Sequence, residues 1–227
     1  MENLNKAFER SPLLSLSSEE VASFKALARA LQTKVGHIVF CEEDCPDYIY
    51  LIQTGHVKIY RNTPLGKIVT VGIRNPGDVI GVAEVLTGMN RCCFAETMEA
   101  SELWQMKGEI FLAMLQSQTK LAVKVAAALG NRLREAETTI LNLVTLEVDH
   151  RLAKLLLNLA KAGVVQGEKG LRISVLLTHQ ELASMIGTCR QTVTTTLRRF
   201  KDEGAIHTGK RYIEIVDGVK LNSYANS

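Results

Sequence analysis

Apolar residues near the C-terminus recur with a helical period on both sides of a glycine. Before Gly187 they predict a helix capped by Thr178, with an inner face of Leu182, Ala183 and Ile186. After it they predict a second helix capped by Thr188, with an inner face of Val193, Leu197 and Phe200. Glycine suits the turn between them, because it tolerates a left-handed backbone. The pattern predicts a helix-turn-helix, with a merely structural helix pair as the alternative.

The residues that follow alternate between apolar and polar positions. Ala205–Ile206, a turn at Thr208–Lys210 and the run Tyr212–Ile215 predict a β-hairpin wing. The first turn of the second helix enters the major groove in helix-turn-helix proteins, where Arg matches guanine and Gln matches adenine. We therefore expect this unit to bind double-stranded DNA. The expected DNA-binding residues are Thr178, His179, Thr188, Arg190, Gln191, Thr192, Thr194, Thr195, Arg198 and Lys210.

The N-terminal half changes from helical to strand periodicity. Residues Ser17–Leu31 predict a short helix with Ser17 or Ser18 as its cap. From Val35 to Gln105, short β-rich runs alternate with turns that contain glycine or proline, which predicts a small antiparallel barrel or roll. The expected strands are His37–Phe40, Tyr48–Gln53, Val57–Arg61, Ile68–Ile73, Val79–Ile80, Ala95–Thr97 and Leu103–Met106.

A long helical pattern runs from about Ile110 to Leu146, after a short helix at Glu109–Leu115. Its apolar residues are spaced alternately three and four apart, as at the a and d positions of a coiled coil. This seam comprises Ala126, Leu129, Leu133, Ala136, Ile140 and Leu143. Its partner is either the roll or the same helix of a second subunit. We expect a homodimer, because a protein with one recognition helix usually binds a two-fold DNA site.

The segment between the long helix and the helix-turn-helix contains one more predicted helix. Asp149 is expected to cap His150–Lys161, which places a hinge near Glu147–Asp149. Gly163–Gly170 is predicted to be a loop. The short strands expected before the recognition unit are Leu171–Ile173 and Val175–Leu176.

Charge and composition add to this picture. Of the 227 residues, 46% are hydrophobic and 22% are charged, as in a soluble globular protein. From Val148 onward there are 12 Lys/Arg against 7 Asp/Glu, net +5, whereas the first 147 residues carry 15 against 17, net −2. A basic C-terminal region suits phosphate neutralisation. Met1–Arg10 has no apolar signal core, and no apolar run is long enough for a membrane span, so we expect a cytoplasmic protein with no membrane partner.

The five cysteines are Cys41, Cys45, Cys92, Cys93 and Cys189. An odd number without a signal peptide indicates reduced thiols. Cys41 and Cys45 lack a second pair at metal-site spacing, and adjacent cysteines rarely form joint metal ligands or an unstrained disulfide. We expect buried or incidental thiols rather than a metal or redox site. The sequence shows no catalytic constellation, phosphate-binding glycine loop or HExxH motif, so we do not expect an enzyme.

The order of β-roll, long helix and winged helix-turn-helix resembles the cyclic-AMP receptor protein/fumarate-nitrate regulator (CRP/FNR) family of bacterial transcription factors. The residues that carry the resemblance are Gly55–Tyr60, Pro76–Gly81, Arg151–Ala160 and Thr178–Gly209. The recognition helix, Arg190–Gln191–Thr192, is similar to that of haem-containing sensors, but the Cys and His that would ligate haem are absent after Val79–Val82.

The resemblance implies an α+β fold in three parts. These are an N-terminal double-stranded β-helix (jelly-roll) sensor domain at 1–115, a dimerisation helix at 116–147 and a C-terminal winged helix-turn-helix at 148–227. In the family the roll binds an effector against the dimer helix, and binding repositions the DNA-binding domains. RNA polymerase is an expected partner if the protein is an activator.

The resemblance argues against cyclic AMP as the effector. Cyclic-AMP binders carry Gly-Glu, then Arg-Ser, and Thr-Ser on the dimer helix, whereas this chain has Val82, Cys92 and Ala136–Glu137 at those points. The segment Gly81–Gly88 is instead similar to the nitrogen-control regulators of cyanobacteria, which sense 2-oxoglutarate. The effector-binding residues implied are Val82, Ala83, Arg91, Arg132 and Glu137. An ordinary surface salt bridge of Arg132 is the alternative.

The expected function is that of a sequence-specific DNA-binding transcription regulator. It would act as a homodimer on a palindromic operator, under the control of a small anionic effector, with 2-oxoglutarate as the candidate. Two alternatives within the same family stay open. One is a thiol-responsive regulator in which oxidation of Cys189 blocks DNA, and the other is a cyclic-nucleotide-responsive regulator.

Overall fold

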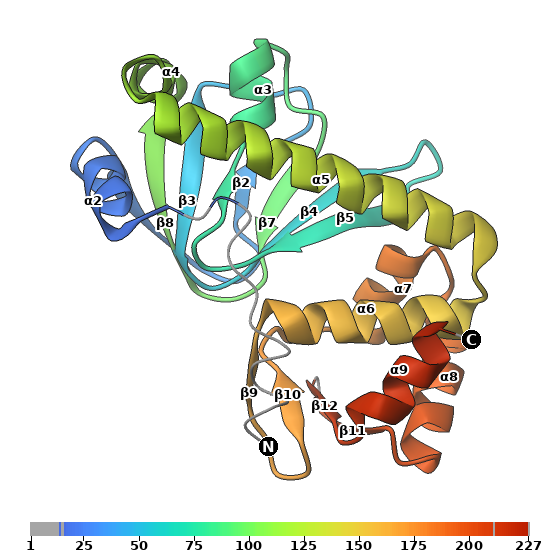
Figure 1. Cartoon of the computed structure of the whole chain (residues 1–227). Coiled ribbons are helices and arrows are strands. Elements are labelled where there is room, and N and C mark those ends of the chain that lie inside the picture. The colour runs from blue at the N-terminus through green and yellow to red at the C-terminus, as the bar shows by residue number, and fades with distance from the viewer. Residues whose placement is uncertain (1–13, 15, 211, 227) are drawn as a thin grey trace. The chain divides into compact units, whose positions relative to one another are not determined.

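The computed structural model describes residue 14, residues 16–210 and residues 212–226 (Figure 1). These residues fall into two compact units, one ending at Ala136 and the other beginning at Glu137. Within the described residues, no helix is both long enough and apolar enough to cross a membrane.

The first unit is built on a roll of two four-stranded antiparallel sheets. One sheet has the order β1 (Arg29–Thr33), β8 (Ser101–Lys107), β3 (Tyr48–Thr54) and β6 (Val79–Ile80). The other has the order β2 (Ile38–Phe40), β7 (Phe94–Thr97), β4 (Val57–Asn62) and β5 (Ile68–Arg74). Every predicted strand of this region is present, with ends shifted by at most a few residues. The interior between the sheets is filled by side chains including Ile52, Val57, Ala95 and Leu103.

The first helix is shorter than predicted. Helix α2 spans Ser18–Ala26 and begins with a capping box, in which Ser17 and Glu20 bond each other's backbone N–H groups. The prediction that it continues to Leu31 is wrong. Leu31 lies opposite Leu103 in the antiparallel pair of β1 and β8. Leu31 follows Leu27 by four positions, which fits the next turn of a helix but equally fits the start of a separate strand. The pairing with a distant strand decides between the two.

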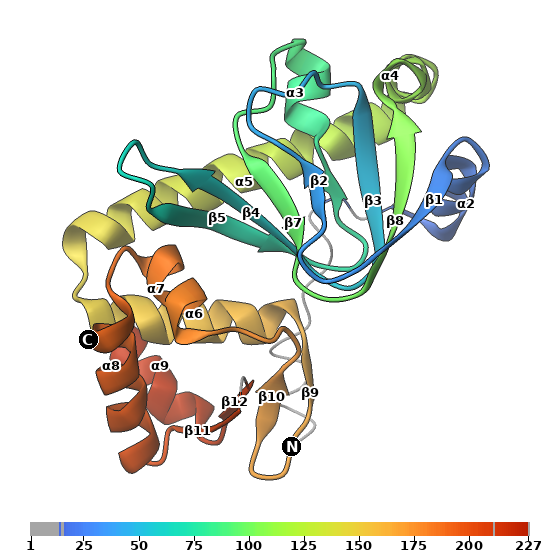
Figure 2. The same ribbon diagram turned by 180° about the vertical axis from the view of Figure 1, so that it is seen from behind.

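Besides α2, which buries Phe24, further helices pack against the roll, as Figures 1 and 2 show. Helix α3 (Val82–Thr87) is six residues long and was not predicted, while α4 (Gly108–Ser117) and α5 (Thr119–Thr145) match the predicted short and long helices. The face of α5 that packs on the core of the roll carries Leu121, Val125 and Ala128. One residue of the predicted seam, Leu129, is partly buried against the same core, so the start of α5 is held by this face together with the first part of the seam.

The second unit contains the winged helix-turn-helix. Its helices are α6 (Val148–Ala162), α7 (His179–Ile186), α8 (Arg190–Asp202) and α9 (Gly218–Asn226). Its sheet has the order β11 (Ile206–Gly209), β12 (Tyr212–Ile215), β10 (Leu171–Ile173) and β9 (Val164–Gln166). The fully buried side chains that join these elements include Leu152, Leu156, Leu182, Val193, Phe200 and Leu221.

Several predicted details of this unit are corrected by the structure. Helix α6 starts at Val148 with Glu147 as its N-cap, so Asp149 lies in the first turn and does not cap it. Part of the predicted loop Gly163–Gly170 forms strand β9, because Leu171 pairs with Gln166. Val175–Leu176 lies outside any strand.

The wing turn and the C-terminal helix also differ from the prediction. Thr208 and Gly209 belong to strand β11, and Gly209 lies opposite Tyr212, so of the predicted turn residues only Lys210 lies outside the strand. Helix α9 was not predicted. It buries Leu221 and Ala225, and the ring of Tyr224 lies 4.7 Å from that of Phe200.

Candidate DNA-binding surface and effector pocket

The turn between α7 and α8 is specified by short-range bonds. Thr178 and Glu181 form a capping box at the start of α7, with the Thr178 hydroxyl accepting from the Glu181 N–H at 3.2 Å. Gly187 ends the helix with a φ of +67°, in the left-handed region. The N–H of Thr188 then donates to the carbonyl of Ala183 at 3.0 Å. These bonds fix the direction in which α8 leaves the turn.

Helix α8 begins one residue later than predicted. Its N-cap is Cys189 rather than Thr188, and no side-chain cap hydrogen bond is formed. The predicted inner residues Val193, Leu197 and Phe200 are all buried, and Thr196 joins them. The exposed side of the helix carries Arg190, Gln191, Thr194, Thr195 and Arg198, with Thr192 half-buried.

His179 connects the two helices of this surface. Its Nδ1 lies 2.8 Å from the hydroxyl oxygen of Thr194, which itself donates to the Arg190 carbonyl at 2.9 Å. Since the Thr194 hydrogen is used in that bond, Nδ1 of His179 is the donor to its oxygen, and Nε2 is left as the other ring nitrogen. Burial and then the charge of Arg190 lower the pKa of His179, which favours the neutral ring.

Strand β12 of the wing is held by an ion pair between a buried glutamate and a partly exposed arginine, which sequence reasoning missed. Glu214 has no exposed surface and accepts from Arg172 at 2.7 Å and from the Lys169 N–H at 3.0 Å. Burial alone would raise the pKa of Glu214, but these hydrogen bonds outweigh it and the pKa is lowered. Arg172 also lies over the Tyr212 ring at 4.0 Å. Lys210, at the end of the wing, is exposed. In a strand that alternates between apolar and polar residues, Glu214 is expected to face the solvent. Its pairing with Arg172 was therefore not predictable without the fold.

Both terminal nitrogens of the Arg91 guanidinium are bonded to other groups of the protein, so they are not free to bind an anion. Arg91 is buried, and its Nη1 donates to the Gly81 carbonyl at 2.8 Å and to Glu84 Oε2 at 3.2 Å. Its Nη2 donates to the Tyr48 carbonyl. Gly81 is required here, since its φ is +80° and an added Cβ would lie 2.7 Å from Arg91 Nη1.

Arg132 approaches the same strand from α5. Its Nη2 donates to the Val79 carbonyl at 2.8 Å, two residues before the carbonyl held by Arg91. Glu137 is exposed and is not brought to this face, as expected for residues about 140° apart around a helix. Val82 is buried among core residues, and Ala83 is exposed. Of the implied effector residues, the structure brings together the two arginines.

A cavity of about 270 Å³ adjoins Arg91. Its lining is Val39, Phe40, Asp44, Cys45, Asp47, Tyr48, Tyr50 and Arg91. Two carboxylates line it beside one guanidinium, so this cavity is not a ready site for a dianion.

Comparisons with known protein families match both halves of the chain. Residues 31–118 match the cyclic nucleotide-binding domain, and residues 150–224 match the Crp-like helix-turn-helix domain. The chain is 29% identical to the cyclic AMP receptor protein of Thermus thermophilus over 216 residues, which covers 95% of this chain and 97% of that protein.

Two further similarities extend over most of the chain. The global nitrogen regulator of Synechococcus elongatus is 28% identical over 205 residues, covering 89% of this chain and 92% of the regulator. The structure of FixK2 from Bradyrhizobium japonicum superimposes with a TM-score of 0.79 at 21% identity, covering 87% and 96% of the two chains, and shows the same fold.

The first matched domain coincides with the roll, and the second coincides with the winged helix-turn-helix. The similar proteins that span most of the chain are transcription regulators. The chain belongs to the CRP/FNR family and is a DNA-binding transcription regulator with a cyclic nucleotide-binding-like domain.

Proposed function

We propose that the protein acts as a homodimer on a palindromic operator and that the apolar seam of α5 forms the dimer interface. The observation that carries the proposal is the exposure of this seam. Leu133 and Ile140 are 62% and 63% exposed, although both are apolar. They are seven residues apart, which is one heptad. The roll, the alternative partner for the seam, is contacted by Leu121, Val125 and Ala128 and by the first part of the seam at Leu129, whereas Leu133 and Ile140 farther along stay exposed. An exposed stripe at heptad spacing favours a second copy of the same helix.

The charges that flank the seam are compatible with a parallel pair of helices. With Ala126, Leu133 and Ile140 at a positions, Arg132 occupies a g position and Glu137 the following e position. In parallel coiled coils, g and e residues of facing helices form ion pairs. Glu137 of the partner subunit would therefore approach Arg132, which one chain alone does not achieve.

The DNA contacts in this proposal come from the exposed side of α8, the start of α7 and the wing. Arg190 and Gln191 would bond base edges in the major groove, and Arg198 and Lys210 would bond phosphates, while Thr178 would hold the start of α7 through its bonds to Glu181. A dimer would place two such surfaces on successive half-sites, which explains why the operator is expected to be palindromic.

The effector in this proposal is a small anion, with 2-oxoglutarate as the first candidate. The support is the pairing of Arg91 and Arg132 with carbonyls only two residues apart, since two guanidiniums can bind a dicarboxylate through bidentate bonds. The ligand would have to replace Glu84 at Arg91. Val82 follows Gly81 where a ribose-binding carboxylate would be needed, which makes a cyclic nucleotide the less favoured effector.

A thermal-shift titration of reduced protein tests the effector. With 2-oxoglutarate, cyclic AMP and cyclic GMP compared side by side, we expect a saturable stabilisation by 2-oxoglutarate alone, of about 2.7 kcal/mol at a hundredfold excess over Kd. Arg132→Ala should abolish it, while Arg134→Ala, on the same helix, should retain it. A response to a cyclic nucleotide alone would refute the dicarboxylate.

A thiol-responsive regulator is the second candidate, because of the surroundings of Cys189. This exposed thiol is the N-cap of α8, and its Sγ lies 3.1 Å from the Thr192 hydroxyl. The hydrogen bond with the Thr192 side chain lowers the pKa of Cys189, which favours the reactive thiolate. Mild peroxide should then reduce DNA binding by the wild type and spare Cys189→Ser. Equal losses in both proteins would exclude this thiol as the sensor, and Cys45→Ser is the matched control.

A further inference from the structure

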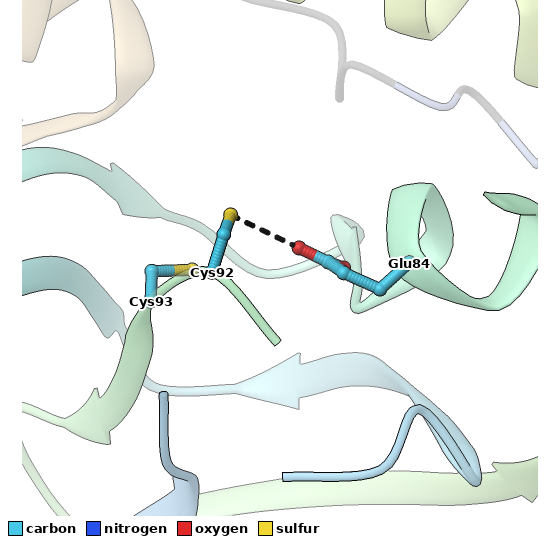
Figure 3. A group of neighbouring side chains, drawn as sticks. All are labelled: Glu84, Cys92 and Cys93. Atoms are coloured by element: carbon cyan, nitrogen blue, oxygen red, sulfur yellow. Dashed lines mark hydrogen bonds between the residues drawn. The ribbon is translucent and has the colours of Figure 1, made fainter. Parts of the chain in front are cut away.

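Three potential metal ligands meet beside α3. Glu84 comes from α3, and Cys92 and Cys93 lie just before β7. One ligand atom from each lies within 4.8 Å of the other two. Figure 3 shows the Cys92 sulfur and the Glu84 carboxylate pointing toward one another, with Cys93 beside them. The backbone bends at Cys93 and strand β7 starts only at Phe94, so these adjacent residues are not obliged to point to opposite sides as they would in a strand.

The spacing of the Cys92 and Glu84 ligand atoms fits a tetrahedral ion. At Zn–S and Zn–O distances of about 2.3 and 2.0 Å, sulfur and oxygen ligands of a tetrahedral zinc ion lie about 3.5 Å apart. The Cys92 Sγ lies 3.5 Å from Glu84 Oε1. An ion could therefore bind between these two groups without separating them.

The charges of the surroundings favour a dication. Two thiolates and the Glu84 carboxylate would carry three negative charges, and a dication together with the buried Arg91 would supply three positive ones. Glu84 can serve both cations, because its Oε2 faces Arg91 Nη1 and its Oε1 faces Cys92. Among the other cations near the two thiols, Arg61 is paired with Glu42 at 2.8 Å, and Arg74 lies on the side of Cys93.

The two sulfur ligands select the kind of ion. Calcium and magnesium prefer oxygen ligands, whereas zinc-like ions bind thiolates and displace the thiol protons.

We infer that Glu84, Cys92 and Cys93 form a binding site for a thiophilic divalent cation such as Zn²⁺. Three protein ligands leave a fourth position for water, as in exchangeable rather than closed structural sites. This proposal departs from the expectation of incidental thiols at Cys92 and Cys93. Since Glu84 also holds Arg91, the ion would tie α3 to the segment before β7 and fix the carboxylate that an anionic effector must displace. The site itself does not depend on any effector being bound.

Cobalt(II) is the probe for this site, because cobalt–thiolate bonds absorb in the near ultraviolet. Metal-free protein, kept reduced with a non-thiol phosphine, is titrated with Co²⁺ and then with Zn²⁺. We expect one Co²⁺ per chain with a thiolate charge-transfer band that Zn²⁺ abolishes. Cys92→Ser and Cys93→Ser should each diminish the band and weaken binding more than about tenfold. Cys45→Ser and Cys189→Ser, which change exposed thiols elsewhere, should change neither.

The proposal is overturned by a wild type without a thiolate band, or by serine variants that keep the same band and affinity. Both serine variants leave the pair of Glu84 and Arg91 intact, so both are expected to fold. Thermal unfolding of each variant without metal checks this directly. Glu84→Gln should weaken binding as well. The affinity of the wild type should rise with pH with a slope near two, because two protons leave on binding.

Discussion

The Nδ1 of His179 lies 2.8 Å from the hydroxyl oxygen of Thr194, so the first residue of α7 is bonded to the exposed side of α8. The two helices of the motif are thus joined by a polar contact at the surface that is proposed to face DNA, in addition to the buried contacts beneath it. Nδ1 donates this bond whether or not Nε2 is protonated, so the sensitivity of the surface to protonation comes from the burial of His179 and the nearby charge of Arg190.

Acidification should weaken the DNA-binding unit through His179. Because its folded-state pKa lies below the ordinary value of about 6.5, its contribution is fully present above that pH and is lost as the pH falls through the lowered pKa. Urea unfolding between pH 7.5 and 5 should show a larger loss of stability for the wild type than for His179→Gln. Identical pH profiles of the two proteins would contradict this assignment.

Arg190→Ala should cost about 1–3 kcal/mol on the cognate operator and relax the preference at one base pair. The reason is that Arg190 is exposed on the first turn of α8, where a guanidinium can bond guanine. Lys210→Ala, on the wing, should instead weaken all sequences alike and lower the salt slope by about one. Competition binding on operator and scrambled DNA separates the two, and an equal loss for Arg190→Ala on both would make it a phosphate contact.

Leu133→Glu should dissociate the proposed dimer. Burying an unpaired charge in each half of the interface should cost at least about 3 kcal/mol, more than a hundredfold in the dimer dissociation constant. Leu65→Glu, at a residue that is 96% exposed in the turn between β4 and β5, is the matched control. Sedimentation equilibrium gives the masses, and a Leu133→Glu protein that remains as dimeric as the control would remove the seam from the interface.

Glu214→Gln should destabilise the winged unit by about 1.5–3 kcal/mol, since a buried carboxylate there accepts from Arg172 and two backbone N–H groups. Because the pKa of Glu214 is lowered on folding, its contribution is present above its unfolded value and is lost as the pH falls through the folded one. The variant should therefore lose less stability than the wild type on acidification below about pH 4.3. Glu203→Gln, at an exposed acid, should match the wild type in both measurements.

Local signals explain what could be predicted from the sequence. Thr178, Glu181 and Gly187 determine helix ends through bonds within a few residues, and the a/d spacing of Leu133 and Ile140 is visible without any fold. The strands of the roll were found because glycine and proline mark their ends.

The features that were missed depend on residues distant in sequence. Leu31 joins a strand because it pairs with Leu103, and β9 exists because Gln166 meets Leu171. Helix α3 is too short for a periodic pattern. The contact between Arg91 and Glu84 could not be predicted either. It forms because α3 and the segment after it bring the two side chains together.

The most direct test of the central claim is selection of binding sites from random double-stranded DNA by the purified protein. A sequence-specific dimer predicts enrichment of an inverted repeat whose half-sites are centred one helical turn, about 10 base pairs, apart and share a guanine that is no longer selected by Arg190→Ala. Enrichment of a single half-site, or of no sequence at all, would contradict the account of a homodimer that recognises a palindromic operator.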